Sequence, residues 1–491
     1  MLTKNFFIDL HGCAKNQVDA EILNGILCKS GWQRVDRAEL ATLIIINSCG
    51  FIEAAKKESI DAVFELRQKC PNAKIILAGC LAERYADVFA CEMEELDGVF
   101  GNGDLSLITG FVNEVCGLSS DASGGCVDSL EASCVVFKRR EARASHKPLL
   151  KQPQVGISSG KRPHLFNFAG SVYIKITEGC NNHCSFCAIP IIRGSLRSRE
   201  IGEILHEMRE FIDRGVYEFN LVGQDLGVFG KEGGGEMPDE KLSPLALLLS
   251  HISRLEGRFV VRLLYIHPDH FPLDILDIML KDARFLPYFD IPFQSGSEAI
   301  IQKMNRCGSP QKYLELIEKI RTAFSSSPYG TAAIRTTFLV GFPGENDENF
   351  EETLSFLKAA HCLWSGVFEY SKEEDTPAFR MRNQVAKRVK SRRRQMLERE
   401  QSLITESMLQ GFVGKVFLVL VEELIDGGEG EKLLIGRTWF QAPDVDGVAV
   451  CSYEKGMRSI DGKAIGEGEL VHVNILKVQG VDLIGKVLNS L

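Results

Sequence analysis

Residues 178–190 read EGCNNHCSFCAIP and place three cysteines, Cys180, Cys184 and Cys187, within eight positions. Structural zinc takes four ligands, usually from two Cys-x2-Cys pairs. The nearby candidate for a fourth ligand is His183, but it lies between two of the cysteines, where a shared tetrahedral site would be cramped. Three thiolates instead hold three irons of a four-iron cubane and leave the fourth iron open. An open metal position is typical of a catalytic site, and a degenerate zinc knuckle is the alternative.

Strand and helix patterns alternate on both sides of this loop. SVYIKI (171–176) is β-prone and precedes the cysteines, and amphipathic segments separate the later runs. These runs are EFNLVGQ, FVVRLLYI, YFDIPFQ, IRTTFLVGF and SGVFEYS. Six such units predict an open or complete β/α barrel, a partial TIM barrel, over residues 164–408. Barrels of this kind carry their active sites where strands end and loops begin.

The rest of the chain predicts two further domains and a connection. NFFIDL, ATLIIINS and AKIILAGC each precede a helical pattern, so residues 1–116 are expected to form an α/β domain with a parallel sheet. Residues 117–163 are rich in Gly and Ser with a basic run, which indicates a linker or surface excursion. A charged helix then leads to residues 409–491, whose short strands and turns predict a small all-β barrel. The fold class is therefore α/β with an added β-barrel.

Composition excludes several classes of protein. The 491 residues are 45% hydrophobic and 25% charged, which is typical of folded soluble domains. No apolar run reaches the ~20 residues that span a bilayer, and we expect a cytoplasmic protein with no membrane partner. Fifteen cysteines in a reducing compartment favour metal binding over disulfides. The net charge of -9 disfavours a protein that grips long nucleic acid.

A second cysteine trio lies in the N-terminal domain. Cys13, Cys49 and Cys80 each follow a predicted strand. Successive strand ends lie side by side in a parallel sheet, so these three thiols are expected to converge although they are far apart in sequence. Taken singly, each cysteine is more typical of a buried packing residue, and the more specific signal is that all three stand at equivalent strand ends.

The spacing of Cys180, Cys184 and Cys187 resembles the motif of the radical S-adenosylmethionine (SAM) enzymes. When this motif is taken together with Cys13, Cys49, Cys80 and the C-terminal barrel, the chain resembles the methylthiotransferases over nearly its whole length outside the linker. The resemblance implies two [4Fe-4S] clusters, one on each trio, with SAM bound at the open iron of the central cluster. The central cluster then generates a 5′-deoxyadenosyl radical, and the second cluster presents the sulfur. An electron donor such as flavodoxin or ferredoxin is also implied.

Several polar or glycine-rich strand ends are candidates for SAM contact. VGFPGE (340–345) allows close backbone approach and corresponds in the family to a segment near SAM. Arginines after the cluster loop suit a carboxylate. The candidates are Gly341, Phe342, Pro343, Gly344, Gln224, Gln294 and Arg193, with Asp225, Arg197 and Arg199 as further possibilities. Ordinary loop hydrogen bonding is the alternative for each.

The family resemblance splits between two substrates. One branch modifies an adenosine in tRNA, and the other modifies the β-carbon of an aspartate in ribosomal small-subunit protein S12. The motifs around the cysteines and GRTWFQAPDVDGVAV resemble the protein-modifying branch, whereas IPFQSGS and the missing threonine after Gln224-Asp225 resemble the tRNA branch. From residue 412 onward there are eight Lys and Arg against twelve Asp and Glu. An acidic barrel suits a basic ribosomal protein, so we do not expect nucleic acid as the direct substrate.

The C-terminal barrel is similar to the TRAM domain, and we expect it to dock the protein substrate. The proposed docking residues are Asp444, Asp446, Trp439 and Phe440. A tRNA methylthiotransferase and a non-catalytic iron–sulfur or zinc protein that docks on ribosomes are the competing hypotheses. The sequence assigns no role to Cys116, Cys126 and Cys134, which lie in or beside the linker.

Overall fold

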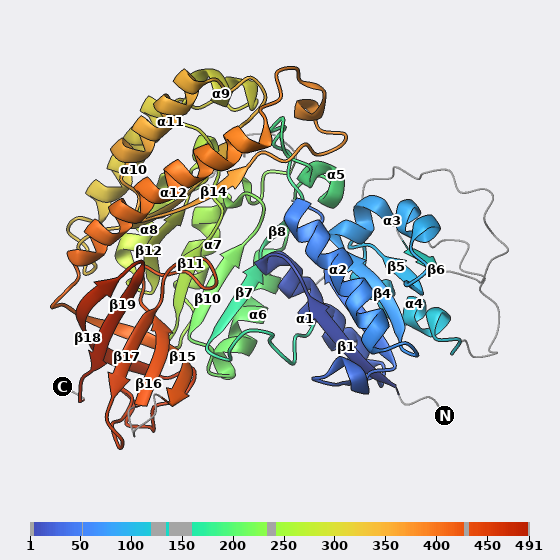
Figure 1. Cartoon of the computed structure of the whole chain (residues 1–491). Coiled ribbons are helices and arrows are strands. Elements are labelled where there is room, and N and C mark those ends of the chain that lie inside the picture. The colour runs from blue at the N-terminus through green and yellow to red at the C-terminus, as the bar shows by residue number, and fades with distance from the viewer. Residues whose placement is uncertain are drawn as a thin grey trace.

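The computed structural model describes residues 4–51, 53–118, 134–136, 160–232, 242–426 and 432–489. It contains two six-stranded sheets and a closed five-stranded barrel, which follow one another along the chain (Figure 1). Between the N-terminal sheet and the C-terminal barrel stands the central β/α unit. No described helix combines the length and the apolar composition that crossing a bilayer requires.

The N-terminal sheet has the order β2-β1-β3-β4-β5-β6. Its strands are β1 (Asn5–Leu10), β2 (Gln33–Arg34), β3 (Leu43–Ser48), β4 (Lys74–Gly79), β5 (Gly98–Phe100) and β6 (Cys134–Val136). Its helices are α1 (Ala14–Lys29), α2 (Glu53–Lys69), α3 (Cys80–Glu92) and α4 (Ile108–Val115), with short 3-10 turns η1 (Ala38–Leu40) and η2 (Leu105–Leu107). Strand β3 is buried along its whole length because helices cover both faces of this mainly parallel sheet: α1 and α4 pack on one face, α2 and α3 on the other.

One part of the expected linker belongs to this sheet. Strand β6 pairs antiparallel with β5, although it falls within the stretch that the sequence predicted as an excursion. Near the end of the same stretch, Arg162 is buried between Glu21 of α1 and Glu207. Most of the stretch, including Cys126, lies outside the described residues, and Cys116 is half-buried at the end of α4.

The central unit contains the six predicted strands in one parallel sheet, in the order β14-β13-β12-β11-β10-β7. They are β7 (Ser171–Lys175), β10 (Glu218–Val222), β11 (Val260–Leu263), β12 (Phe285–Asp290), β13 (Ala333–Val340) and β14 (Trp364–Glu369). Helices that follow the strands are α6 (Ile201–Asp213), α7 (Pro244–Ile252), α8 (Asp274–Lys281), α9 (Glu298–Lys303), α10 (Pro310–Phe324) and α11 (Asp347–Ala360). The sheet stays open between β7 and β14, so the barrel is partial.

Short elements complete the central unit at the strand ends. A two-stranded ribbon joins β8 (Thr177–Glu178) to β9 (Arg197–Ser198), and α5 (Ile189–Arg193) lies between these strands. The 3-10 turns are η3 (Leu226–Val228), η4 (Pro268–His270) and η5 (Pro377–Arg380). Helix α12 (Lys387–Gln410) then runs to the C-terminal barrel, which has the order β15-β16-β17-β19-β18. Its strands are β15 (Val416–Asp426), β16 (Lys432–Arg437), β17 (Ala449–Tyr453), β18 (Leu470–Gln479) and β19 (Asp482–Val487).

The C-terminal barrel packs against the inner face of the central sheet near the strand starts. Arg437 reaches Glu218, the first residue of β10, with Nη2 2.6 Å from Oε2. Arg262 of β11 contacts the same carboxylate at 2.9 Å. The apolar core of the barrel is continuous with residues of β11, β12 and β14. This arrangement leaves the opposite ends of the central strands, where the cysteine loop lies, facing the N-terminal domain.

The packing corrects our expectation about substrate docking. Asp446 accepts hydrogen bonds from the Tyr288 hydroxyl at 2.6 Å and from Arg335 at 2.5 Å, and its side chain is fully buried. Phe440 is also fully buried, and the Trp439 ring packs against it and Tyr329.

Asp446 and Phe440 therefore attach the barrel to the central sheet and are not available to a partner. Trp439 is partly buried, and Asp444 is exposed and accepts a hydrogen bond from the Tyr173 hydroxyl at 2.9 Å. The sequence pattern misleads here because an acidic turn looks the same whether it faces solvent or another domain.

Candidate active site

The central trio lies on the loop that leads from β8 to α5. Cys180 and Cys184 are buried, and the Cys187 amide donates to the Cys184 carbonyl at 3.0 Å. Gly179 has φ +71°, and a Cβ there would lie 2.1 Å from the Ser195 carbonyl oxygen, so the loop requires glycine. Backbone and side-chain hydrogen bonds also fix this loop to the end of α9. In one of them the Ser185 amide donates to the Met304 carbonyl at 3.0 Å. The three thiols are therefore held on a rigid loop.

The electrostatics of this loop suit a metal cluster. Burial, together with the neighbouring thiols, raises the pKa of Cys180 and of Cys187 to about 12. All three cysteines are free, with no disulfide among them. Iron supplies the positive charge that three adjacent thiolates require, so the donor set fits a [4Fe-4S] cluster.

The N-terminal trio converges as the sheet topology requires. Cys13 directly precedes α1, Cys49 follows β3, and Cys80 begins α3 directly after β4. A Cβ on Gly12 would lie 2.9 Å from the Cβ of Cys49, and one on Gly50 would lie 2.7 Å from the Cys80 carbonyl oxygen. Burial, with smaller contributions from the charges of Cys13 and Cys49 and against the opposing charge of Arg193, raises the pKa of Cys80 to about 12. Three cysteines that form no disulfide thus lie together at the carboxyl edge of the sheet and fit a second cluster.

One member of the N-terminal trio contacts the segment after the central motif, across the boundary between the domains. Cys80 packs with Ala188 and Ile192, which belong to the segment that follows the central motif. Arg193, at the end of the same helix, donates from Nη2 to Cys80 Sγ at 3.2 Å. The loop that carries one trio is therefore in direct contact with a member of the other.

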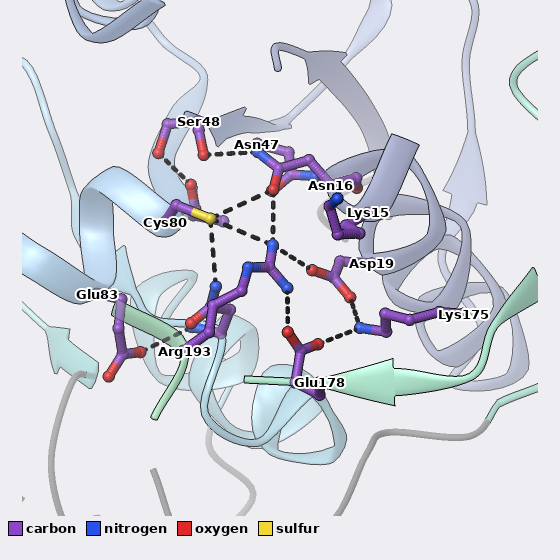
Figure 2. A network of polar contacts seen from close by, with 12 residues as sticks. Lys15, Asn16, Asp19, Asn47, Ser48, Cys80, Glu83, Lys175, Glu178 and Arg193 are labelled. Carbon is purple, nitrogen blue, oxygen red and sulfur yellow. Dashed lines mark hydrogen bonds and ion pairs between the residues drawn. The ribbon is translucent and has the colours of Figure 1, made fainter. Parts of the chain in front are cut away.

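Figure 2 shows a buried polar network around Arg193. The guanidinium donates to Glu178 Oε1 at 2.8 Å, Asn16 Oδ1 at 2.7 Å and Asp19 Oδ2 at 3.1 Å. Lys175 pairs with the same two carboxylates, Asp19 at 2.5 Å and Glu178 at 2.6 Å. Burial opposes ionisation of Glu178, yet Arg193 and Lys175 hold its pKa well below the usual value. We expected Arg193 near SAM, but both of its terminal nitrogens contact protein groups beside Cys80.

The other SAM candidates lie at the carboxyl ends of the central strands. Gly341 has φ +73° and its amide donates to Glu345 at 2.9 Å, while Gly344 has φ +79°. Gln294 has φ +70°, an uncommon conformation for a residue with a side chain, and bridges to Phe338. Gln224 follows β10 and is half-buried, and Phe342 is fully buried between Pro343 and the strand. All of these lie on the same edge of the sheet as the central trio.

Asp225 anchors a cluster of polar groups next to the central loop. Its Oδ2 accepts from Asn182 at 2.9 Å and lies 2.9 Å from His270 Nδ1. Its Oδ1 accepts from the amides of Gly227 and His267, both at 3.0 Å. These bonds join two strand ends to the cysteine loop, so the Asp225 carboxylate already has four protein partners. The sequence analysis did not select His267 and His270.

Further residues that the sequence analysis missed lie between the two trios. Lys15 is buried, donates to the Gly223 carbonyl at 3.0 Å and lies 3.6 Å from the centre of the Tyr265 ring. Burial raises the pKa of Asp290 to about 6 against the opposing charge of Arg335. Buried charged residues leave no periodic pattern in the sequence that would mark them as part of a site. Lys15 was the exception, because its position two residues after Cys13 places it beside a candidate ligand.

The remaining arginines of the cluster loop have structural contacts. Arg199 pairs with Glu207 at 2.5 Å, and Arg197 donates to the carbonyls of Ser195 and Arg193, both at 3.2 Å. Both therefore brace the ribbon of β8 and β9 rather than extend toward a ligand.

Comparison with known proteins agrees with this geometry. The model of the uncharacterized protein family UPF0004 matches residues 5–101, that of the radical SAM superfamily matches 174–357, and that of the TRAM domain matches 413–488. The solved structure of TsrM, a radical S-adenosylmethionine methyltransferase from Kitasatospora setae, has a TM-score of 0.53 at 13% identity, covering 74% of this chain and 72% of that chain. That likeness shows a shared fold alone.

Curated relatives match over nearly the whole length. The ribosomal protein uS12 methylthiotransferase RimO of Treponema denticola is 50% identical over 97% of this chain and 99% of its own length. The protein of the same name from Aquifex aeolicus is 35% identical over 97% of this chain and 95% of its own length. The chain therefore belongs to the RimO family of ribosomal protein uS12 methylthiotransferases, within the radical SAM superfamily.

Proposed function

We propose that this chain transfers a methylthio group to the β-carbon of an aspartate in ribosomal small-subunit protein uS12. The observation that carries the proposal is the packing of Cys80, a member of the N-terminal trio, against the helix that follows Cys187. Radical formation and sulfur delivery must occur near one carbon, so the two sites have to share one cavity edge. The names of the relatives favour uS12 over tRNA as the substrate.

Six cysteines would hold the metal clusters. Cys180, Cys184 and Cys187 would bind the cluster that takes SAM at its open iron, and Cys13, Cys49 and Cys80 would bind the second cluster. When bound, these cofactors supply the hydrogen abstraction and the sulfur. An electron donor protein such as flavodoxin or ferredoxin would deliver the electrons, and the reaction would take place in the cytoplasm, where ribosomes are found.

The chain's own residues would bind SAM and shield the site from water. The backbone of Gly341 and Gly344, with Phe342 and Pro343 between them, would approach SAM closely because glycine has no Cβ in the way. Gln224 and Gln294 would add side-chain hydrogen bonds from neighbouring strand ends. Phe186 packs with an apolar cluster that contains Phe342 and Tyr370, and this cluster keeps water from the loop of the central trio.

Iron counting on the anaerobic full-length chain tests the ligand assignment. We expect about eight irons, two cubanes of four. Replacing Cys180, Cys184 and Cys187 by Ala should leave about four and abolish SAM cleavage, and replacing Cys13, Cys49 and Cys80 should also leave about four. A matched control replaces the buried cysteines Cys70, Cys362 and Cys451, which belong to neither trio, and should retain about eight. An unchanged iron content after loss of either trio would refute the assignment.

Mass spectrometry of a deletion strain tests the substrate. The uS12 protein should lose one methylthio group, and tRNA adenosines should be unchanged. The opposite pattern would assign the chain to the tRNA-modifying reaction.

A further inference from the structure

Lys15 is a buried cation at the meeting point of the domains. It lies in the first turn of α1, two residues after Cys13, and only 7% of the residue is exposed. The side chain leaves the N-terminal domain and reaches the central sheet, where Nζ donates to the Gly223 carbonyl beside Gln224. Tyr265, whose backbone φ is +69°, places the centre of its aromatic ring 3.6 Å from the ammonium nitrogen.

The contacts of Lys15 include no carboxylate. A carbonyl oxygen and an aromatic face are its partners among the described residues. Lys175 is also buried, but its ammonium group has counter-ions, because it pairs with both Asp19 and Glu178. In Figure 2 no ion pair joins Lys15 to either of these carboxylates.

Burial lowers the pKa of the Lys15 amine and outweighs the charges of Cys13, Asp290 and Glu178, which act on it as well. Among the described residues neither carboxylate forms an ion pair with it. A buried ammonium without a directly contacting counter-ion is unfavourable, and an anion that enters the site relieves that cost.

We propose that Lys15 binds the side-chain carboxylate of the aspartate that is modified, and that it thereby sets the specificity for that residue. This inference rests on the proposed function. The carboxyl carbon of an aspartate is bonded directly to its β-carbon, so an ammonium group that holds the carboxylate also places the carbon to be modified. Lys15 follows Cys13, a member of one trio, and contacts the strand end next to the other site, which suits a group that orients substrate between them. Tyr265 acts as a positioning residue for the amine.

Binding of purified uS12 to the anaerobically reconstituted full-length chain tests this proposal. Four affinities are measured by calorimetry in the presence of SAM: wild-type chain and Lys15→Met, each with uS12 that carries Asp or Asn at the modified position. The wild-type chain should bind the Asp form about 30-fold or more tightly than the Asn form, which is the lower end for breaking a buried charge pair. The Lys15→Met chain should bind both forms with nearly equal affinity.

Lys175→Met is the matched control, because it removes a buried amine whose counter-ions lie within the protein. It should lower stability while retaining the preference for Asp over Asn. Equal binding of the Asp and Asn forms by the wild-type chain would overturn the proposal without reference to any variant. So would a Lys15→Met chain that keeps the preference but no longer binds SAM, because Lys15 would then hold the SAM carboxylate.

The test separates this inference from the proposed function. If the wild-type chain binds neither form of uS12, or if the deletion strain retains methylthio-uS12, the proposed function itself fails. If uS12 is the substrate and Lys15→Met retains the discrimination, only the assignment of Lys15 fails.

Discussion

Arg193 links the end of the helix after the central trio to Cys80 of the N-terminal trio. Its guanidinium donates to Cys80 Sγ, while Glu178, two residues before Cys180, balances its charge. Asn102 Nδ2 is a second, more distant donor to the same sulfur at 3.5 Å, and Asn16 Oδ1 also lies 3.3 Å from it. Hydrogen bonds to ligand sulfurs stabilise the more negative, reduced state of a cluster and so raise its potential.

We therefore expect Arg193→Met to lower the midpoint potential of the second cluster. The shift should be on the order of 59 mV, which corresponds to a tenfold change in a one-electron equilibrium. An EPR-monitored redox titration measures it, in a chain whose central trio is replaced by Ala so that only the second cluster contributes. Asn102→Ala should shift the potential in the same direction but less, because the amide is neutral.

Arg162→Met is the control for Arg193, since Arg162 is a buried, doubly ion-paired arginine that touches no cysteine. It should leave the potential unchanged. An unaltered potential in Arg193→Met would contradict a role in redox tuning. A cluster lost only in that variant would show that Arg193 serves assembly instead.

Among the elements, the cysteine loop between β8 and α5 depends on backbone conformation. Gly179 adopts a left-handed conformation in which Ser195 and Gly194 carbonyl oxygens occupy the position of a Cβ, at 2.1 and 2.6 Å. No side chain fits there unless the ribbon of β8 and β9 moves away from the loop.

Gly179→Ala should therefore lose the central cluster while the second one remains. Iron content should fall from about eight to about four, and SAM cleavage should disappear. Gly202→Ala is the control, because Gly202 lies exposed in α6 with no atom within 4 Å of its Cβ position. That change should stabilise the helix by ~1 kcal/mol and keep all the iron. A full iron complement in Gly179→Ala would contradict the geometry.

A second element, the segment after β14, fastens the central unit to the N-terminal domain. Glu373 contacts Lys56 of α2 at 2.5 Å and also Arg84 of α3, and its side chain is 4% exposed. Burial raises the pKa of Glu373, but hydrogen bonds from Lys56, Ser371 and Arg84 lower it more, so the net pKa lies below the usual value.

The pH dependence of stability follows from that direction. A carboxyl whose pKa is lower in the folded state stabilises the protein above its unfolded pKa of 4.5, and this contribution is lost as pH falls through the folded value. Glu373→Gln should lower stability by about 1–3 kcal/mol at pH 7, and the difference from wild type should shrink below about pH 4.5. Denaturant unfolding at a series of pH values measures this. The exposed neighbour Glu374→Gln should have no comparable effect.

For the whole molecule, the C-terminal barrel is attached through buried charges. Arg437 contacts Glu218 through both terminal nitrogens, at 2.9 and 2.6 Å, and Glu422 through Nε at 2.5 Å. Although burial opposes ionisation of Glu218, Arg437 and Arg262 hold its pKa well below the usual value. The barrel therefore acts as a closure for one end of the central sheet, which leaves the other end to substrate.

Arg437→Met should weaken this attachment by about 3–5 kcal/mol, because Glu218 and Glu422 lose a buried partner. Thermal unfolding should show a lower midpoint, with the barrel and the central unit no longer unfolding together. Lys486→Met is the control: its ion pair with Glu454 is exposed, so the loss should be below about 1 kcal/mol. Equal effects of the two substitutions would contradict the assigned role of Arg437.

The sequence by itself determined the elements and singled out the six cysteines as candidate cluster ligands. The six central strands, the N-terminal parallel sheet and the closed barrel were predictable because apolar periodicity reports burial locally. The convergence of Cys13, Cys49 and Cys80 was also predictable, because parallel strands end at one edge. Spacing alone singled out Cys180, Cys184 and Cys187.

Only the tertiary structure decided which polar residues face which partner. Asp446 and Phe440 pack between domains, Arg193 contacts Cys80 rather than a strand end, and Lys15 crosses from α1 to Gly223. A charged residue has the same place in the sequence whether it meets solvent, a counter-ion or a neighbouring domain. These contacts join residues more than 100 positions apart, and no local pattern encodes them because their energy depends on how separately folded sheets pack together.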